Sequence, residues 1–238
     1  MNSLIKNSFR EITDDHPLWQ HEFLMRCRDG NLCLSDVQIL AVQMYKFSKE
    51  FNRILASILS CCQDEAAQLV ILENLFDEMG QGDIRQSHPE LFRQFTRALG
   101  IDDKTLAAIP TAPETLALIE TYLRIPSQYG YLAALGTVCY ASEGIVSSLY
   151  TQLYTGIIGS APLPKESLIF FEVHIDVDDS HAAKLAAVIE PRITHEEEIK
   201  VKLAIIEAMD ARVQFFNGIQ RQISQHNWFP NSLLLADA

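Results

Sequence analysis

The sequence predicts one all-α domain, a helical bundle formed by residues 1–238. Apolar residues recur at helical spacing along nearly the whole chain. Glycines and prolines stand where these periodic stretches end or begin, as they do at the ends of helices. No tract of Gly, Ser or Pro is long enough to be a linker, and 238 residues with 48% hydrophobic content are enough for one sizeable core.

The individual helices follow in order from this spacing. Residues 17–29 form the first predicted helix, which Gly30 would end. A long second helix should run from Ser35, with Ser35 and Gln38 as a capping box, to about Ser60. The remaining predicted helices are 65–79 ended by Gly80, 88–99 ended by Gly100, one opened by Pro113 and broken or kinked at Pro126, 131–154, and 196–225 opened by a Thr194–Glu197 capping box.

The segment 171–179 conflicts locally with this all-helical prediction. Its apolar residues alternate with polar ones and are rich in β-branched types, a pattern that favours a strand. No second strand-like run is available to pair with it, and an isolated strand leaves its backbone unsatisfied. We therefore predict a helix of low intrinsic propensity, and such a conflict is a hint of function.

The composition argues against several classes of function. A formal net charge of −12 predicts no nucleic-acid binding and no adhesion to an anionic membrane surface. No segment reaches 18 unbroken apolar residues, and Asp14 and Asp15 stand where a signal peptide needs an apolar run, so we expect a cytoplasmic protein without a membrane span. The five cysteines are odd in number and include no CxxC pair, which argues against a disulfide framework or structural zinc.

A possible metal-binding pattern occurs in the same unusual segment. On a helix, His174, Asp178 and His181 stand at positions i, i+4 and i+7 and share one face. Two imidazoles and a carboxylate converging from one face suit iron, manganese or zinc. A solvated polar face would give the same spacing, so both interpretations stay open.

Three further residues are candidate ligands. Glu143 is the only charged residue between Arg124 and Lys165, inside the most apolar helix, and a buried carboxylate must be paired, protonated or bound to a cation. Glu78 and His88 flank a turn in which glycines can fold the chain back. The alternatives are a structural salt bridge for Glu143, and ordinary helix-end residues for the other two.

Together these residues resemble a known set. The order Glu78, His88, Glu143, His174-x3-Asp178-x2-His181 is similar to the metal motif of the haem-oxygenase-like diiron oxidases and oxygenases, in the superfamily of TenA-type thiaminases and pyrroloquinoline quinone synthases. The resemblance covers roughly residues 65–225. It implies an up-and-down bundle of about seven helices that binds two irons, or manganese or a mixed pair, activates O2 and oxidises a small molecule. It also implies a homodimer.

The resemblance assigns roles to particular residues. Glu78, His88 and His181 would bind one iron, His174 and Asp178 the other, with Glu143 bridging them as a catalytic residue; Glu50 would be an additional ligand. One subgroup, related to a chlamydial death-domain-associated protein, makes p-aminobenzoate from its own tyrosine. Tyr140, one turn before Glu143, is therefore a candidate catalytic residue, and the alternative is a core tyrosine with a bonded hydroxyl.

Two other classes of function remain open. A TenA-type metal-free hydrolase needs a nucleophilic cysteine where this chain has Thr137, and Cys139 is out of register by two residues. A pyrroloquinoline quinone synthase-like protein would work without metal. The second of these classes is a non-enzymatic interaction module. Metal analysis of anaerobically purified protein separates the diiron enzyme from these alternatives.

Overall fold

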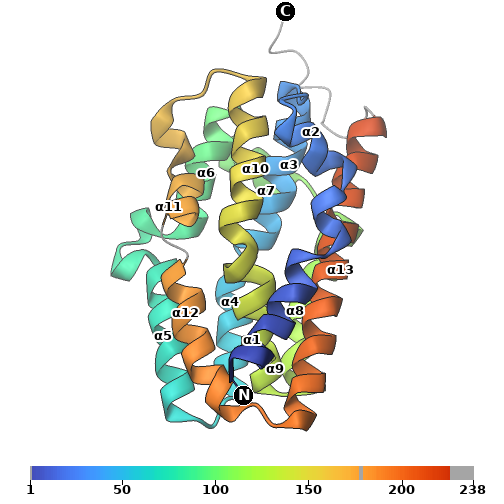
Figure 1. The fold of residues 1–238 in the computed structure, drawn as a ribbon. Coiled ribbons are helices and arrows are strands. Elements are labelled where there is room, and N and C mark those ends of the chain that lie inside the picture. The colour runs from blue at the N-terminus through green and yellow to red at the C-terminus, as the bar shows by residue number, and fades with distance from the viewer. Residues whose placement is uncertain (1, 177–178, 226–238) are drawn as a thin grey trace, which may run out of the picture.

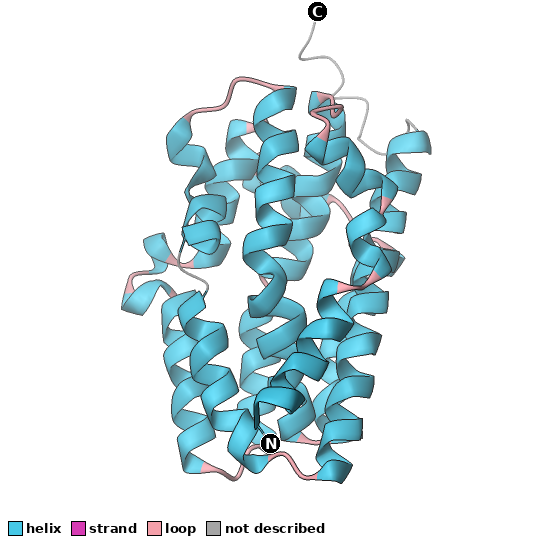
Figure 2. Cartoon of the chain, in the orientation of Figure 1, coloured by secondary structure: helices cyan, strands magenta, loops and turns pink. Residues whose placement is uncertain are grey.

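The computed structural model describes residues 2–176 and 179–225, and these ranges contain helices and no strand (Figures 1 and 2). The α-helices are α1 (Asn2–Asp14), α2 (Glu22–Arg28), α3 (Leu34–Ser48), α4 (Phe51–Cys61), α5 (Glu65–Glu78), α6 (His88–Ala98), α7 (Asp103–Ala108), α8 (Pro113–Tyr129), α9 (Tyr131–Val138), α10 (Gly144–Ser160), α11 (Ile169–Asp176), α12 (Asp179–Ile189) and α13 (His195–Gln225). A π-helix, η4 (Cys139–Glu143), joins α9 to α10, and the 3-10 helices are η1 (Pro17–Gln20), η2 (Gly80–Gly82), η3 (Ile84–Gln86), η5 (Lys165–Leu168) and η6 (Glu190–Arg192).

The helices pack side by side as a bundle (Figure 1). The long helix α13 lies along α8 and α9, and α10 packs against α2 and α11. On the other side of the molecule, α12 lies along α5, and α11 contacts α6. The candidate ligands therefore come from neighbouring elements, namely α5, α6, the junction of η4 with α10, and α11.

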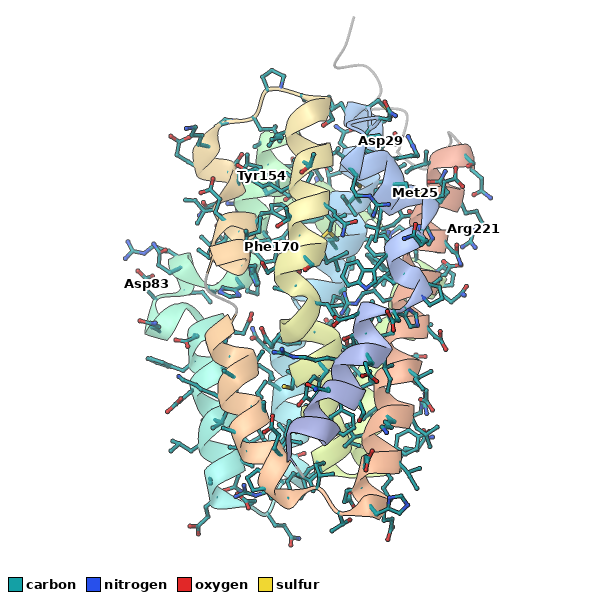
Figure 3. The ribbon with its side chains drawn as sticks, in the orientation of Figure 1. Met25, Asp29, Asp83, Tyr154, Phe170 and Arg221 are labelled. Carbon is teal, nitrogen blue, oxygen red and sulfur yellow. The ribbon has the colours of Figure 1, made fainter. Side chains whose placement is uncertain are left out.

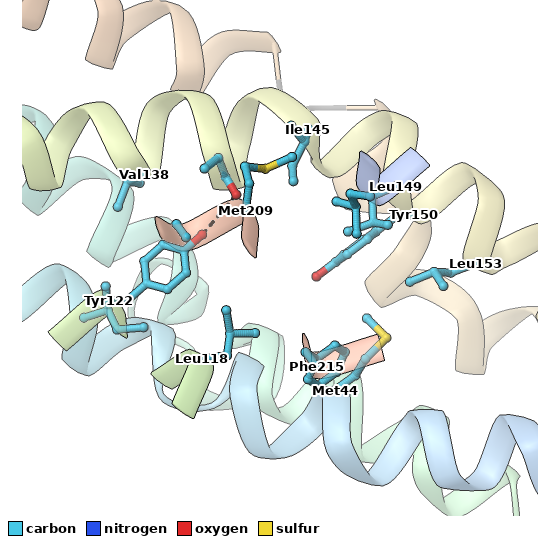
Figure 4. Close-up of a cluster of buried hydrophobic side chains, with 14 of the residues drawn as sticks. Met44, Leu118, Tyr122, Val138, Ile145, Leu149, Tyr150, Leu153, Met209 and Phe215 are labelled. Carbon is cyan, nitrogen blue, oxygen red and sulfur yellow. Dashed lines mark hydrogen bonds between the residues drawn. The ribbon is translucent and has the colours of Figure 1, made fainter. Parts of the chain in front are cut away.

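The core is formed by apolar faces of several of these helices. Figure 4 shows Ile145, Leu149 and Leu153 of α10 in a cluster with Met44 of α3 and Phe215 of α13. Each of these side chains is buried. Burial of such side chains contributes roughly 1.5–3 kcal/mol each, so the interior of the bundle supplies much of the driving force for folding.

The run Tyr131–Ser160 is long and apolar enough to cross a membrane by length and composition alone. In this structure 78% of its most apolar window is buried inside the fold. It therefore has the place of a core helix, enclosed by the amphipathic helices around it.

Most of the helices predicted from the sequence are present. The helix of residues 65–79 is α5, that of 88–99 is α6, and that of 196–225 is α13. The Glu197 N–H donates to Thr194 Oγ1 at 3.2 Å, which is one of the two hydrogen bonds of the predicted capping box at the start of α13. In the strand-like segment 171–179, residues 171–176 lie in helix α11 and residue 179 begins α12, as predicted, while residues 177 and 178 lie outside the described residues.

Other boundaries differ from the prediction. The predicted helix 35–60 is two helices, which meet at Lys49 and Glu50, and its capping interaction runs from the Cys33 N–H to the Asp36 carboxylate at 3.3 Å instead of joining Ser35 and Gln38. The segments α1 and α7 were not predicted, and residues 17–29 divide into η1 and α2. These shorter pieces explain why the chain has more helical segments than the expected seven or so.

The sequence predicts a break or a kink at Pro126, and the helix does not break there. Helix α8 continues through Pro126 to Tyr129 and ends at Gly130, whose φ of +91° is a conformation that favours glycine. A proline lacks the N–H that would bond to the carbonyl four residues earlier, so α8 passes Pro126 with one backbone hydrogen bond fewer.

Candidate metal centre

The turn between α5 and α6 brings Glu78 and His88 together. At Gly80, with φ +69°, an added Cβ would lie 2.5 Å from the Ser87 nitrogen, so only glycine fits this close approach. Figure 3 shows Asp83 on this turn, which projects from the bundle. The chain reverses there, and the His88 Nδ1 lies 2.9 Å from the Glu78 Oε2 although ten residues separate them.

His174 approaches the same pair from α11. Its ring centroid lies 4.5 Å from that of His88 and 4.3 Å from that of Phe170. One ligand atom each from Glu78, His88 and His174 falls within 4.8 Å of the others. Three donor groups from three helices thus converge at one point, which is the arrangement that a metal ion requires.

The hydrogen bonding of His174 sets its tautomer. Its Nδ1 lies 2.6 Å from the carbonyl oxygen of Phe170, which can only accept, so Nδ1 carries the proton and Nε2 keeps its lone pair. Burial, followed by the neighbouring His88, lowers the pKa of His174 to about 4. His174 is therefore a neutral imidazole at physiological pH with Nε2 available as a ligand.

The two groups that face His174 perturb one another. Burial alone would raise the pKa of Glu78, but His88 outweighs it and the net shift is downward. Burial would lower the pKa of His88, but the negative charge of Glu78 outweighs it and the net shift is upward. The carboxylate of Glu78 and the imidazole of His88 thus stabilise each other's charged form. When a metal ion binds, it takes the place of the proton on the imidazole.

Glu143 is held at this site by an irregular stretch of helix. It is the last residue of the π-helix η4, is 6% exposed, and accepts a hydrogen bond from the Asn74 Nδ2 at 3.2 Å. The wider register of a π-helix frees carbonyl groups, and here the Ala141 oxygen accepts from the Tyr122 hydroxyl at 3.0 Å. Burial, and after it the charge of Glu78, raises the pKa of Glu143 to about 7.

Glu78, Glu143 and His174 line one cavity. Its volume is about 40 Å³, and it is partly open to solvent. Its apolar lining comes from Phe47, Phe51, Ile145 and Val146, and its other polar lining from Ser48, Ser142, Tyr150 and Arg212.

His181 lies next to this group of three ligands and has a different partner. Its Nε2 is 3.0 Å from the Oδ2 of Asp77, the residue before Glu78 on α5. The resemblance groups His181 with Glu78 and His88, whereas the structure places His174 there. Asp178 falls on residue 178, outside the described residues.

Two other predicted residues, Glu50 and Tyr140, do not line this cavity. The Glu50 carboxylate pairs with Arg53 and with Lys49 at 3.7 Å, so it is occupied by surface cations. Tyr140 is buried against Phe9, 5.2 Å between ring centroids, and lines a different cavity with Arg10. Its hydroxyl has no hydrogen-bond partner among the described residues.

Three residues of the site were missed from the sequence. Asp77 and Asn74 stand on α5 within one turn of Glu78, and their polarity on a core-facing stretch was a usable signal. Tyr150 lines the cavity two turns after Glu143, with its ring centroid 5.3 Å from that of His174, and Figure 4 shows its hydroxyl directed into the interior. Counting from Glu143 along an ideal helix would have identified it.

The residues present fit a metal site on their own chemistry. The His88 Nδ1 is buried without an aligned hydrogen-bond partner among the described residues. Within the same part of the chain, neither Glu78 nor Glu143 forms an ion pair with a lysine or arginine, although both are buried. His88 is the cationic partner of Glu78 in the metal-free chain, and a bound metal ion would stabilise both buried carboxylates.

Comparisons with known proteins agree with this chemistry. A family model described as iron-containing redox enzyme matches residues 38–216. A 4-aminobenzoate synthase from Chlamydia pneumoniae is 25% identical over 218 residues, which cover 92% of this chain and 95% of that protein. A 4-aminobenzoate synthase from Nitrosomonas europaea is 28% identical over 228 residues, with 90% and 91% covered.

Two solved structures resemble the fold. A TenA homologue from Pseudomonas syringae superposes with a TM-score of 0.72 at 16% identity, covering 86% of each chain. A domain with a heme oxygenase-like fold from Shewanella denitrificans gives a TM-score of 0.78 at 16% identity, covering 94% of each chain. At this identity the likeness concerns the fold, and it confirms the predicted haem-oxygenase-like, TenA-like helical bundle.

Proposed function

We propose that this chain, which belongs to the family of iron-containing redox enzymes, binds two iron ions and uses O2 to oxidise a small molecule. The observation that carries the proposal is the convergence of Glu78, His88 and His174 within 4.8 Å, beside the buried Glu143. Manganese, or a mixed pair of metals, would suit the same nitrogen and oxygen donors.

The proposed ligand roles follow the geometry where it is described. Glu78, His88 and His174 would hold one ion, and Glu143 would bridge to the second. His181 and Asp178 would complete the site around that second ion. Glu50 is not among these proposed ligands, because its carboxylate pairs with Arg53 and Lys49.

When bound, the ferrous ions would supply electrons for the reduction of O2. The chain itself positions the groups around them. The Phe170 carbonyl fixes the tautomer of His174, Asn74 orients Glu143, and Asp77 holds the His181 ring. The apolar side chains of the cavity keep bulk water from the reacting molecule.

Metal analysis of the purified chain tests this proposal. Protein prepared without O2 and supplied with ferrous iron should retain about two irons per chain after gel filtration. Glu78→Ala should lose most of this iron because it removes the carboxylate of the three converging ligands. The matched control is His195→Asn, since His195 is exposed at the start of α13. Wild-type protein without iron, or a control that loses as much as Glu78→Ala, would contradict the proposal.

The product of the reaction is a separate part of the proposal. The relatives named 4-aminobenzoate synthase make 4-aminobenzoate the first product to look for. Incubation of the iron-loaded chain with O2 and a reductant, followed by mass spectrometry of small molecules, tests for it. Its absence would leave an oxidase or oxygenase with another substrate, which a panel of small organic acids and amines would then address.

The metal-free alternatives have less support. A TenA-type hydrolase needs a nucleophilic thiol, and none of the residues lining the cavity is a cysteine. Thr137, at the position expected for that cysteine, donates its hydroxyl to the Ala133 carbonyl at 2.9 Å. A pyrroloquinoline quinone synthase-like protein would have no use for the cluster of ligands. A cytoplasmic location and a homodimeric assembly also remain proposals.

A further inference from the structure

Arg212 of α13 is a buried cation. It is 6% exposed, yet it forms no ion pair with any carboxylate in the described ranges. Other partly buried arginines differ in this respect, because Arg26 pairs with Asp36 and Arg192 pairs with Asp64. A buried charge without an opposite charge is costly, so this one calls for an explanation.

The protein contacts of Arg212 satisfy only part of its guanidinium. The Nη2 donates to the Tyr122 hydroxyl at 3.1 Å and to the Ala141 carbonyl at 3.3 Å. The guanidinium carbon lies 5.3 Å from the centroid of the Phe47 ring, a weak cation–π contact. The Nε–H is buried without a partner, and Nη1 donates to no described residue. Arginine offers five N–H donors, so a substantial part of its capacity is left for a ligand.

The place of Arg212 shows where that ligand would lie. Arg212 lines the same cavity as Glu78, Glu143 and His174. Its contact with the Ala141 carbonyl puts it beside the π-helix that carries Glu143 two residues later. The remaining lining is mainly apolar and includes Phe47 and Phe51. A cation, apolar side chains and proposed metal ligands thus line one cavity.

We propose that Arg212 binds the carboxylate of a small organic acid substrate, whose apolar body packs against Phe47 and Phe51 and whose other end reaches the proposed metal ligands. This assignment of the substrate class rests on the proposed function. Planar guanidinium and planar carboxylate match in geometry, and their charge-assisted hydrogen bonds are among the strongest in proteins.

The charges in the cavity favour a carboxylate over a phosphate. One guanidinium balances a single negative charge, whereas a phosphate monoester carries close to two at neutral pH. Glu78 and Glu143 line the same cavity and would repel the second charge. The apolar lining also disfavours a strongly hydrated dianion.

A purely structural role for Arg212 is the competing explanation. Its bonds to Tyr122 and Ala141 would then serve only to satisfy the carbonyl freed by the π-helix. The two explanations differ in one respect, because only a ligand-binding role distinguishes a carboxylate from its uncharged isostere.

Isothermal titration of the full, metal-free chain measures this difference. The probes are phenylacetate, 3-phenylpropionate and hexanoate, each paired with its amide, and inorganic phosphate. Using metal-free protein ensures that a carboxylate cannot bind through iron. At least one of the acids should bind, roughly ten- to a hundred-fold more tightly than its amide, and phosphate should bind more weakly than that acid. Amides that bind as tightly as their acids, or no binding by any of the acids, would overturn the proposal without any variant being made.

The variants Arg212→Met and Arg212→Lys provide the second measurement. Arg212→Met should bind the best acid ten- to a hundred-fold more weakly and leave binding of its amide unchanged, while Arg212→Lys should fall between them. Equal losses for acid and amide would mean a structural role and would refute the assignment. If Arg212→Met does not fold, the acid-to-amide ratio of Arg212→Lys still decides, because an unchanged ratio contradicts the need for a guanidinium fork. Iron binding is measured separately, so a chain that binds the acid but retains no iron after ferrous iron is supplied contradicts the proposed function alone.

Discussion

Replacing Glu143 with glutamine should stabilise the metal-free protein at high pH. The buried carboxylate has its pKa raised to about 7, from an ordinary value of 4.5, by burial and by Glu78. A carboxyl group with a raised pKa in the folded state binds its proton more tightly when folded, so stability falls as the pH rises through this range. Glutamine has nearly the same shape, can accept from the Asn74 side chain, and carries no charge to bury.

The magnitude follows from the two pKa values. Each unit of difference corresponds to about 1.4 kcal/mol, so the charged Glu143 costs about 3 kcal/mol at pH 8 and about 1 kcal/mol or less at pH 5. Glu143→Gln should therefore gain about 3 kcal/mol of unfolding free energy at pH 8 and little at pH 5, close to the unfolded pKa.

Urea denaturation of chelator-treated protein at the two pH values measures this gain. A functional site is expected to lower the stability of the metal-free protein. Ferrous iron should stabilise the wild type alone, so that the wild type becomes more stable than Glu143→Gln when iron is bound. A gain that is the same at both pH values, or a Glu143→Gln protein less stable than wild type at pH 8, would refute the reasoning.

Three further predictions follow from the site. Gly80→Ala should destabilise the chain by roughly 1–3 kcal/mol and reduce iron binding, because the added Cβ would lie 2.5 Å from the Ser87 nitrogen. Thermal unfolding measures the loss of stability and metal analysis measures the iron content; unchanged iron binding would contradict the prediction. If 4-aminobenzoate forms, Tyr150→Phe should lower its yield strongly and Tyr140→Phe should not, because of these two tyrosines only Tyr150 lines the metal-site cavity. Quantitative mass spectrometry measures the yield, and a larger loss in Tyr140→Phe would contradict the prediction. Backbone amides of residues 171–176 should exchange more slowly with ferrous iron than without, since this helix has poor intrinsic propensity, and equal strong protection in both states would exclude such coupling.

The sequence predicted much of the fold because its signals are local. Glycines after α5 and α6, and the Thr194 cap of α13, act within one or two turns, so they are visible in the residues themselves. The convergence of Glu78 and His88 was also open to prediction, since Gly80 and Gly82 allow the chain to reverse between them. The strand-like segment 171–176 was assigned correctly only by asking whether a partner strand existed.

The parts that were missed depend on contacts between distant residues. The apolar spacing of residues 131–154 does not predict the π-helix, because a π-helix differs from an α-helix in its hydrogen-bond register and requires no particular residue type. Arg212 lies in a charged helix and looks like a surface residue until the fold encloses it. The division of residues 35–60 into two helices was missed in the same way, since Lys49 and Glu50 are both common inside helices.

Anomalous diffraction at the iron edge, from crystals grown without O2 and soaked in ferrous iron, tests the central claim most directly. The account predicts two strong peaks for each chain, one bounded by Glu78, His88 and His174 and the second next to it beside Glu143. Peaks elsewhere on the acidic surface, or none at these residues in crystals whose solution shows bound iron, would contradict it.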